Sequence, residues 1–288
     1  MLLNPIDFFI VGGQRCGTTS LYYYLTQHPS IFLPKLKEPH YYTKNSLPSY
    51  LPVVKNRQNY LKLFTDSASS SIKGESSTSY LMDPESPALI KKDNPDAKIL
   101  ICLRNPIERT YSAYLAQYRS NKTNLSFDDY IKINPDSLIG DEKKGHNFLN
   151  SYYFEAVSKY IEYFKFDNVK IIISEEFNNS INTTLDEILL FLNIKVPFNK
   201  LDIEKQNIFK FPKNNLCKSI MNNNNIVKLC SNLIPSPINH LLFKQLITRN
   251  KPVMLNESRV FLKNKYFIDV KKLSNLLNMP IPWKEFIN

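Results

Sequence analysis

The sequence predicts an α/β fold of three layers, in which helices flank a central, mainly parallel sheet and the C-terminal part is helical. Apolar-rich runs of strand length recur at residues 6–11, 98–103 and 169–173, and helical patterns separate them. Strands that alternate with helices in this way are typical of parallel sheets. From residue 198 onward the pattern is helix and loop. We find no internal repeat and no linker, so we expect one domain over residues 1–288.

The first half of the chain opens with a run that ends at Gly12 and Gly13, which is typical of a strand buried on both faces. The following helix ends at His28 and Pro29, because proline lacks the amide that a continuing helix needs. The elements expected in this half are a strand at 6–11, a helix at 17–27, a loop at 35–42, a serine-rich turn at 67–71, a strand at 72–75 and a helix around 84–93.

The second half begins with the most strand-like segment of the chain, KILICL at residues 98–103. Pro106 then opens a helix, since proline is favoured in the first helical turn. The elements expected after it are a helix with apolar positions from Tyr153 to Phe164, a strand at 169–173, a helix at 183–192, a turn at 222–225 and an amphipathic helix at 257–278.

Composition bounds the function without choosing it. A chain of 288 residues with 43% hydrophobic and 12% aromatic residues is globular with a sizeable core. Lys and Arg exceed Asp and Glu by 37 to 26, for a net charge of +11. Such an excess reflects either solubility or an anionic partner, for example a charged cofactor, an acidic polymer, nucleic acid or a membrane surface. Because the positive charge is scattered and no nucleic-acid motif is present, we expect no nucleic-acid partner.

The cysteines and histidines do not form a metal-binding pattern. The four cysteines include no C-x-x-C pair, and the four histidines do not stand beside them at metal spacing. We therefore expect no metal, and whether Cys217 and Cys230 pair is left open. Neither a signal peptide nor an apolar run of membrane length is recognisable. We expect a cytoplasmic protein without a transmembrane segment, and the sequence does not predict its oligomeric state.

A glycine-rich turn joins the first strand to the first helix in the stretch FIVGGQRCGTTSLYYY, residues 9–24. A strand–turn–helix unit directs backbone amides and the positive end of the helix dipole at one spot, where anions bind. Gly13 and Gly17 allow close backbone approach, and Thr18, Thr19 and Ser20 add hydroxyl donors. An ordinary capped helix is the alternative, but glycines, hydroxyls and a cation coincide here and favour an anion site.

This turn departs from the loop that binds nucleoside triphosphates. That loop, G-x-x-x-x-G-K-[ST], has a lysine where this chain has Thr18, and kinases also need an acid at the end of a second strand. Here the strand at 98–103 ends at Arg104, which repels Mg²⁺ and attracts a second anion. The sequence therefore predicts two anion sites for a nucleotide phosphorylated at two separate positions. A kinase or NTPase and a non-catalytic polyanion-binding module are the alternatives.

Cys16 lies in the same turn. A thiol at a helix N-terminus has a lowered pKa and suits a nucleophile. Thiol phosphatases, however, need an arginine six residues after the cysteine, and this chain has Tyr22 there. We therefore interpret Cys16 as a small residue that fills the loop.

Five segments are recognisable together, in this order: GGQRCGTTSLYYYLTQHP at 12–29, KEPHYY at 37–42, GESSTSYL at 74–81, LRNPIERTYSAY at 103–114, and the tail from Met254 to Trp283. With them the chain resembles the sulfotransferases that use 3′-phosphoadenosine 5′-phosphosulfate (PAPS). It is most similar to the carbohydrate branch, the heparan-sulfate type and its bacterial relatives. The resemblance covers nearly the whole chain and implies a P-loop-like form of the predicted fold.

The resemblance implies which residues hold PAPS and its product adenosine 3′,5′-bisphosphate. The backbone amides of residues 13–19 and the hydroxyls of Thr18 and Thr19 would hold the 5′-phosphosulfate. Arg104 and Ser112 would bind the 3′-phosphate. The full cofactor-binding set that we expect is Gly13, Gln14, Arg15, Cys16, Gly17, Thr18, Thr19, Ser20, Arg104, Ser112, Tyr153, Arg249 and Lys251.

The resemblance also implies metal-independent transfer of the sulfuryl group to a hydroxyl of a saccharide or glycoconjugate, with an amine as the less favoured acceptor. Glu38 would be the general base, and Arg15 would contact the oxygen that bridges phosphate and sulfate. His40 is the competing base, or it orients Glu38 or the sugar. An acidic acceptor would suit the basic charge of the chain.

Two departures from the family bear on these expectations. The heparan 3-O type has a lysine where this chain has Ser76, so the acceptor need not be heparan-like. The glycine- and arginine-rich cofactor loop is represented only by residues 248–252, where Arg249 and Lys251 either cover the cofactor or are solvated charges. Tyr153 matches an aromatic residue of the family, and a core tyrosine is the alternative.

Overall fold

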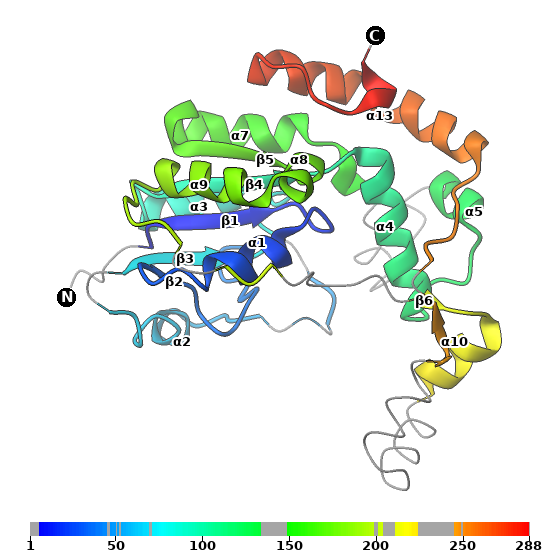
Figure 1. The fold of residues 1–288 in the computed structure, drawn as a ribbon, viewed down its shortest axis with the longest axis horizontal. Coiled ribbons are helices and arrows are strands. Elements are labelled where there is room, and N and C mark those ends of the chain that lie inside the picture. Colours follow the sequence, from blue (N-terminus) through cyan, green and yellow to red (C-terminus); the bar gives the residue numbers. More distant parts are fainter. Residues whose placement is uncertain are drawn as a thin grey trace, which may run out of the picture. The chain divides into compact units, whose positions relative to one another are not determined.

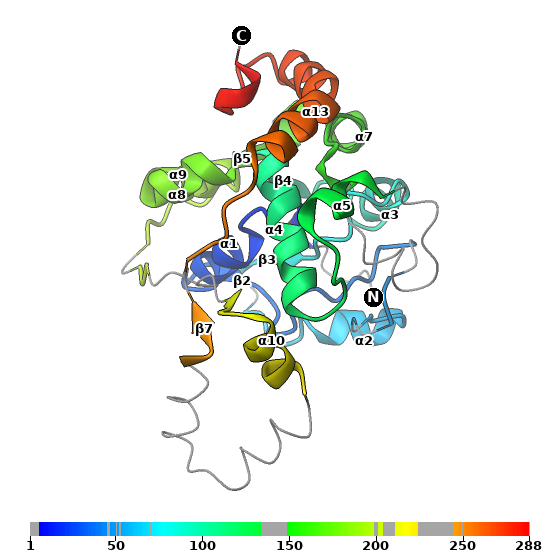
Figure 2. The same ribbon diagram turned by 90° about the vertical axis from the view of Figure 1, so that its right-hand side faces the viewer.

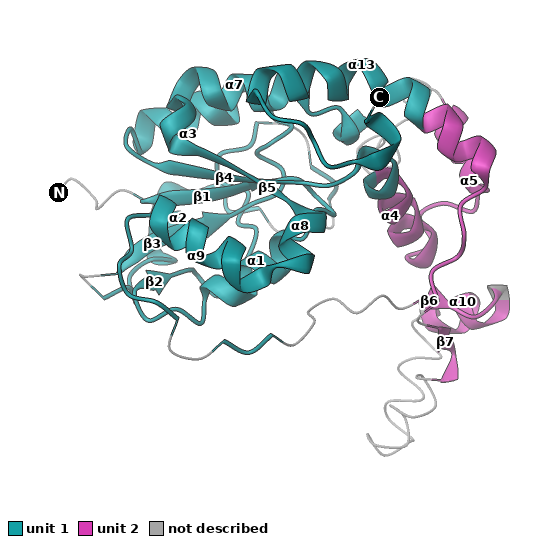
Figure 3. Ribbon diagram, turned by 45° about the horizontal axis from the view of Figure 1, so that its top comes forward, with its two compact units in different colours: residues 1–109, 149–206, 263–288 teal, residues 110–148, 207–262 magenta. Residues whose placement is uncertain are grey.

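The computed structural model describes residues 6–44, 47–49, 51, 53–68, 71–133, 149–198, 201–203, 211–223, 245–248 and 250–287. The chain divides into two compact units (Figure 3). Unit 1 comprises residues 1–109, 149–206 and 263–288, and unit 2 comprises residues 110–148 and 207–262. The expectation of one domain stays a prediction.

A five-stranded parallel sheet forms the centre of unit 1 (Figure 1). Its strands are β1 (Phe8–Gly12), β2 (Ile31–Phe32), β3 (Ile72–Ser76), β4 (Lys98–Leu103) and β5 (Val169–Ile173), in the order β2-β3-β1-β4-β5. This confirms the predicted α/β class, and β4 and β5 have their predicted bounds. We missed β2 because two residues show no periodicity. Since β1 lies between β3 and β4, the carboxyl ends of these three strands are neighbours.

Helices cover both faces of the sheet (Figures 1 and 2). One face carries α1 (Thr18–Leu25), α8 (Ser174–Asn179) and α9 (Ile181–Phe191), whose apolar side chains join the core. The opposite face carries α3 (Ser86–Asp93) and α7 (Phe154–Phe164). In α7, Val157, Tyr160 and Phe164 are buried, and their spacing places them on one side of the helix.

The pairing of β1 with β3 depends on a glycine. Phe8 stands opposite Gly74 in the register, and a Cβ atom at Gly74 would lie 2.1 Å from Cζ of the Phe8 ring. The ring therefore occupies the space that any side chain at position 74 would need. This close approach brings the residues after β3 beside those after β1.

The remaining helices of unit 1 lie outside these two layers. The elements are α2 (Arg57–Lys62), η2 (Leu149–Ser151), η3 (Phe166–Asn168), η4 (Lys284–Phe286), the first residues of α4 (Pro106–Arg119) and the part of α13 (Asn256–Leu277) that follows residue 262. In α13, Tyr266, Val270 and Leu273 are buried at spacings of four and three residues, which confirms the predicted amphipathic helix.

Unit 2 contains α5 (Phe127–Lys132), α10 (Asn215–Asn222) and an antiparallel pair of β6 (Phe211–Pro212) and β7 (Ile247–Thr248). The pair differs from the predicted helix and loop, because strands of two residues leave no pattern in the sequence. Of the predicted turn at 222–225, Asn222 ends α10, and residues 224 and 225 lie outside the described part of the chain. Among the described residues, no helix has the length and apolar character that membrane crossing requires.

Candidate functional site

Residues 12–20, which we call the glycine loop, join β1 to α1. Gly17 precedes the helix with φ +88°, a left-handed conformation that favours glycine. No side chain caps α1, and its first turn contains no acidic residue. The amides of Thr18, Thr19 and Ser20 have no acceptor within the helix, because the first intrahelical bond runs from Leu21 N to Gly17 O. The helix therefore presents unneutralised donors at the edge of the sheet.

Two hydrogen bonds fasten the glycine loop to β4 and its end. The Gly13 amide donates to Cys102 O at 2.6 Å, and Arg104 Nη1 donates to Arg15 O at 3.4 Å. In this structure the Gly13 amide thus anchors the loop, although we expected it among the anion donors. The loop needs this anchor because it leaves the sheet at that residue. At the start of α1, Thr18 is buried and Thr19 and Ser20 are half-buried, while the Arg15 side chain is exposed.

Arg109 lies under the glycine loop, and the sequence analysis did not select it. Its side chain is fully buried, with Nε donating to Gln14 O at 3.0 Å and Nη1 donating to Ser151 Oγ at 3.3 Å. A buried guanidinium requires such acceptors. The signal was present in LRNPIERTYSAY, where Arg109 follows Arg104 by five residues. Through its hydrogen bond to Gln14 O, Arg109 holds the glycine loop, and its guanidinium group adds positive charge to the site.

The Cys16 thiol points into the protein. Its side chain is 1% exposed, and Sγ lies 3.8 Å from Tyr153 Oη. Burial raises the pKa of the thiol, although the guanidinium of Arg109 opposes this shift. A raised pKa is the reverse of what a nucleophile needs, so the geometry favours the loop-filling interpretation.

Tyr153 contacts the backbone of Arg104 from the core. Its ring is fully buried, and its hydroxyl donates to Arg104 O at 2.9 Å. Its amide donates to Asp269 Oδ2 of α13 at 2.7 Å. These contacts favour the core alternative for Tyr153, which holds the backbone from which the Arg104 side chain projects.

Carboxylates fix the residue that follows Arg104. The Asn105 amide donates to Glu175 Oε1 at 3.0 Å, and Trp283 Nε1 donates to Glu175 Oε2 at 3.2 Å. The side-chain amide of Asn105 donates to Glu285 Oε2 at 2.9 Å. The strand end that carries Arg104 is thus held by side chains from α8 and from the C-terminal segment.

Residues 37–43, which we call the carboxylate loop, run beside the carboxyl end of β3. Lys37 Nζ donates to Glu38 Oε1 at 2.6 Å, and His40 Nε2 lies 3.6 Å from Glu38 Oε2. The Glu38 amide donates to Ser76 O at 2.9 Å. Glu38 and His40 have φ of 63° and 53°. A left-handed conformation is costly for residues other than glycine and persists only where neighbours hold it.

Two serines of the segment after β3 hold His40. Its amide donates to Ser77 Oγ at 3.0 Å, and its ring Nδ1 lies 2.8 Å from Ser79 Oγ. The side chain is 2% exposed, and burial lowers the pKa of the imidazole, while the Glu38 carboxylate opposes the shift. A lowered pKa keeps the ring neutral at neutral pH. Within the described residues, Nε2 has no hydrogen-bond partner.

The two loops meet at one edge of the sheet. β1 ends in the glycine loop, and its neighbour β3 ends at Ser76, which binds the Glu38 amide. Burial raises the pKa of the Cys102 thiol in β4, and the ammonium of Lys37 is close enough to oppose that shift. Lys37 is part of the motif KEPHYY, but the sequence alone did not indicate a role for it. Its place beside Glu38 and near β4 makes it a further cation of the site.

Of three further expected site residues, two belong to unit 2 and one lies outside the described residues. Ser112 is a half-buried residue of α4 in unit 2, and Lys251 is an exposed residue of the same unit whose ammonium lies 4.8 Å from the centroid of the Tyr111 ring. Arg249 lies outside the described residues. The cofactor contacts expected of these three residues stay predictions.

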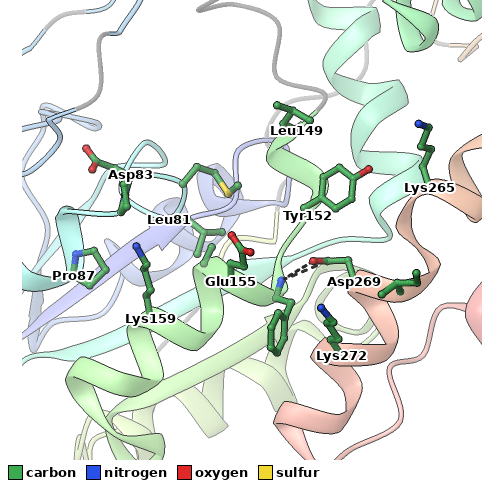
Figure 4. Close-up of a pocket in the computed structure, with 15 residues that line it drawn as sticks. Leu81, Asp83, Pro87, Leu149, Tyr152, Glu155, Lys159, Lys265, Asp269 and Lys272 are labelled. Carbon is green, nitrogen blue, oxygen red and sulfur yellow. Dashed lines mark hydrogen bonds between the residues drawn. The ribbon is translucent and has the colours of Figure 1, made fainter. Parts of the chain in front are cut away.

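A cavity of about 600 Å³ opens in unit 1 between the segment after β3, the start of α7 and the side of α13 (Figure 4). Side chains around it include Leu81, Asp83, Tyr152, Lys159, Lys265 and Lys272. Asp83 Oδ2 also accepts a hydrogen bond from Thr43 Oγ1 at 2.6 Å, so one wall of the cavity is fastened to the carboxylate loop. Among the described residues, no three His, Cys, Asp or Glu side chains gather as metal ligands.

Comparison with known proteins gives concordant matches. The family model described as "Sulfotransferase domain" matches residues 5–231. Human carbohydrate sulfotransferase 15 is 31% identical over 43% of this chain and 29% of its own length. Mouse bifunctional heparan sulfate N-deacetylase/N-sulfotransferase 4 is 26% identical over 96% of this chain and 30% of its own length. The chain thus spans about a third of these relatives. The solved sulfotransferase of Alicyclobacillus acidocaldarius is 24% identical, with a TM-score of 0.72 over 96% of this chain and 97% of that one, and shares the fold.

Proposed function

Because the chain belongs to the sulfotransferase domain family, we propose that it transfers the sulfuryl group of PAPS to a hydroxyl of a saccharide. The observation that carries this proposal is the meeting of two loops at one edge of the sheet. The glycine loop presents uncapped helix donors beside Arg104. The carboxylate loop presents Glu38 beside a neutral imidazole.

The residues present fit the donor nucleotide. Bound PAPS would supply an activated sulfuryl group attached to a phosphate leaving group. The first-turn amides and hydroxyls of Thr18, Thr19 and Ser20 are donors suited to the 5′-phosphosulfate. Arg104, at the end of the neighbouring strand, is the cation suited to the 3′-phosphate. No acidic residue in the first turn of α1 opposes an anion there.

Glu38 is the proposed general base. Its Oε1 is held by Lys37, so Oε2, which faces the neutral His40, takes the proton of the acceptor hydroxyl as the new oxygen–sulfur bond forms. His40 Nε2 lies 3.6 Å from this oxygen. Arg15 and Lys37 stabilise the negative charge that grows on the leaving phosphate oxygen as its bond to sulfur breaks. The proposed mechanism uses no metal.

The proposed acceptor is an acidic saccharide. The relatives' names refer to carbohydrate and to heparan sulfate, and the cavity of unit 1 offers an aromatic ring at Tyr152 and ammonium groups at Lys159 and Lys272. Aromatic faces and cations are suited to sugar rings and to their carboxylates. The proposal includes a hydroxyl rather than an amine as the acceptor group, and a cytoplasmic location.

Calorimetric titration with adenosine 3′,5′-bisphosphate in EDTA tests the donor site, with ATP and Mg²⁺ as the comparison. We expect saturable, metal-independent binding of the bisphosphate. Binding of ATP without binding of the bisphosphate would contradict the proposal and support a triphosphate loop.

A transfer assay with labelled PAPS tests the acceptor. The acceptors are a uronic-acid-containing oligosaccharide, its carboxyl-reduced form and a form with free amino groups. We expect the highest rate with the first. Equal rates with the carboxyl-reduced form would refute the acidic acceptor, and transfer only to the amino form would reassign the acceptor group.

A further inference from the structure

A buried carboxylic acid lies next to the carboxylate loop and takes no part in the proposed mechanism. Glu75 is in β3, opposite Phe9 of β1, and is 1% exposed. Acidic side chains are almost never fully buried unless they are paired, and among the described residues Glu75 forms no ion pair. A position of this kind needs an explanation.

Hydroxyl groups from two other segments bind one oxygen of Glu75. Oε2 accepts from Tyr80 Oη at 2.8 Å and from Tyr60 Oη at 3.0 Å. Oε1 is buried and has no hydrogen-bond partner within the described part of the chain. The ring of Tyr42 packs edge-on against Tyr60 and Tyr80, with centroid distances of 5.5 and 6.0 Å. The carboxyl group is thus enclosed by tyrosines on its bound side.

The direction of the hydrogen bonds connects Glu75 to the carboxylate loop. The Tyr42 amide donates to Tyr80 Oη at 3.1 Å. A phenol has one proton. Because Tyr80 gives that proton to Glu75, its lone pairs are turned toward the Tyr42 amide. A chain of two hydrogen bonds therefore runs from the Tyr42 amide through the Tyr80 hydroxyl to the Glu75 carboxyl group. Tyr42 lies near the end of the carboxylate loop, which also carries Glu38.

The same segment holds the loop at three more points. Ser76 O binds the Glu38 amide, and Ser77 Oγ binds the His40 amide. Ser79 Oγ binds the His40 ring. Residues 75–80 thus hold the two left-handed residues of the carboxylate loop from one side, and Glu75 is the only acid among these six residues.

The protonation state of Glu75 is sensitive to pH near neutrality. Burial raises the pKa of Glu75 to about 7. The nearby hydroxyls of Ser77, Tyr80 and Tyr60 oppose this shift, and the charge of Glu38 adds to it. The titratable groups that face it are Tyr60 from α2, Tyr42 and Glu38 from the carboxylate loop, Tyr80 from the segment after β3 and Tyr160 from α7. Burial raises the pKa of each of these tyrosines well above its usual value. Glu75 is therefore the group of this cluster that titrates near pH 7.

We propose that Glu75 is a positioning residue whose ionised carboxylate fixes the carboxylate loop through Tyr80, so that Glu38 is aligned for catalysis. The catalytic part of this inference rests on the proposed function, while the structural part does not. A charge-assisted hydrogen bond is about twice as strong as a neutral one. Loss of the charge on Glu75 therefore loosens the bond from Tyr80 and, with it, the hold on the Tyr42 amide.

The test compares Glu75→Gln with the wild-type chain. Gln keeps the shape of the side chain and removes the charge. We expect kcat with PAPS and the uronic-acid-containing oligosaccharide to fall about tenfold, with the affinity for adenosine 3′,5′-bisphosphate unchanged. The wild-type kcat should rise through pH 7, and the variant should lack this rise. Hydrogen exchange of the amides in residues 40–43 should be about tenfold faster in the variant at pH 8.

Two further variants sharpen the test. Tyr80→Phe removes the connecting hydroxyl and should reproduce the faster exchange while Glu75 is intact. Glu162→Gln, at an exposed position of α7, is the matched control and should behave as wild type.

Unchanged exchange in both Glu75→Gln and Tyr80→Phe would overturn the positioning role, and so would a wild-type pH profile in Glu75→Gln. If the wild-type chain transfers no sulfate, the proposed function fails, but the exchange experiment still decides whether Glu75 holds the loop.

Discussion

The glycine loop and the carboxylate loop leave neighbouring strands at the same edge of the sheet, yet they are built differently. The glycine loop presents backbone amides. Its left-handed residues include Gly17, which adopts this conformation without strain, and Arg15, which has a φ of 68° and adopts it at a cost. The carboxylate loop presents side chains, and its left-handed residues are Glu38 and His40, which do so at a cost. The first loop is fastened by the carbonyl of Cys102 and the guanidinium groups of Arg104 and Arg109. The second is fastened by the carbonyl of Ser76 and the hydroxyls of Ser77, Ser79 and Tyr80.

This difference indicates a division of labour. Backbone donors are insensitive to the identity of most side chains, so the glycine loop should tolerate substitution outside its glycines and the proposed ligands Arg15, Thr18, Thr19 and Ser20. Each part of the carboxylate loop depends on a particular functional group, so single substitutions there should affect turnover strongly. Substitutions in the first loop should change nucleotide affinity, and those in the second should change kcat.

The largest effect is expected for Glu38→Gln. Removal of a general base costs about 10²–10⁴-fold in rate, and the amide cannot take a proton from the acceptor. The affinity for adenosine 3′,5′-bisphosphate, measured by calorimetry, should stay within about twofold of wild type, because the variant keeps the glycine loop. Near-normal turnover would transfer the role of base to His40, which His40→Asn would then test.

Glu75→Gln should change how stability depends on pH. The pKa of Glu75 is raised from 4.5 to about 7 in the folded protein, so between these values the unfolded chain binds fewer protons than the folded one. The free energy of unfolding of the wild-type chain therefore loses up to about 3 kcal/mol from this group as the pH rises from 4.5 to 8. The variant lacks this loss, so its free energy of unfolding should increase relative to that of the wild-type chain as the pH rises from 4.5 to 8.

Urea unfolding at a series of pH values measures this difference. Glu162→Gln should follow the wild-type curve, and comparison with wild type removes the opposite contribution of His40. Parallel curves for Glu75→Gln and wild type would show that Glu75 does not titrate in this range.

Arg104→Ala should weaken binding of the bisphosphate by about 1.5–3 kcal/mol, since it removes a charge-assisted contact. Calorimetry measures the effect, and Arg104→Lys should lie between Ala and wild type because lysine keeps the charge without the fork of donors. Arg57→Ala is the control, since Arg57 is exposed and pairs with Asp93. An Arg104→Ala variant that bound as tightly as wild type would remove Arg104 from the nucleotide site.

The smallest effect is expected for Gly17→Ala. A residue with a Cβ costs about 1–2 kcal/mol in the left-handed conformation, and the new methyl group would lie 3.2 Å from Ser174 Oγ. We expect a several-fold loss in affinity for the bisphosphate with kcat at saturation unchanged. Thr26→Ala, at the other end of α1, is the control. A kcat effect larger than the affinity effect would contradict the division between the two loops.

The sequence was most informative where local patterns are long. KILICL and VKIII have enough consecutive apolar residues to mark β4 and β5, and the glycines after β1 mark the turn that leads into α1. The short strands β2, β6 and β7 were missed because two residues cannot show a period.

In the candidate site, the sequence pointed to the side chains that we propose for the chemistry and missed the residues that hold them. Arg109 and Glu75 were within quoted motifs, but burial and hydrogen-bond partners decide their importance, and these depend on residues far away in the chain. Tyr153 shows the same limit, because only the fold reveals that its hydroxyl binds the backbone of Arg104. Positions fixed by long-range contacts leave no local signal.

The C-terminal segment holds the backbone around Arg104. Asp269 accepts a hydrogen bond from the amide of Tyr153, and Glu285 accepts one from the side chain of Asn105. Trp283 donates to Glu175, which also binds the Asn105 amide. A ribosome synthesises the C-terminal segment after all five strands of the sheet. Until Asp269 and Glu285 have been synthesised, the amide of Tyr153 and the side chain of Asn105 therefore lack these acceptors. The nascent chain can pair its strands before these residues emerge, but the end of β4 is completed only afterwards. We expect newly synthesised protein to acquire nucleotide binding as one of the last events of its maturation.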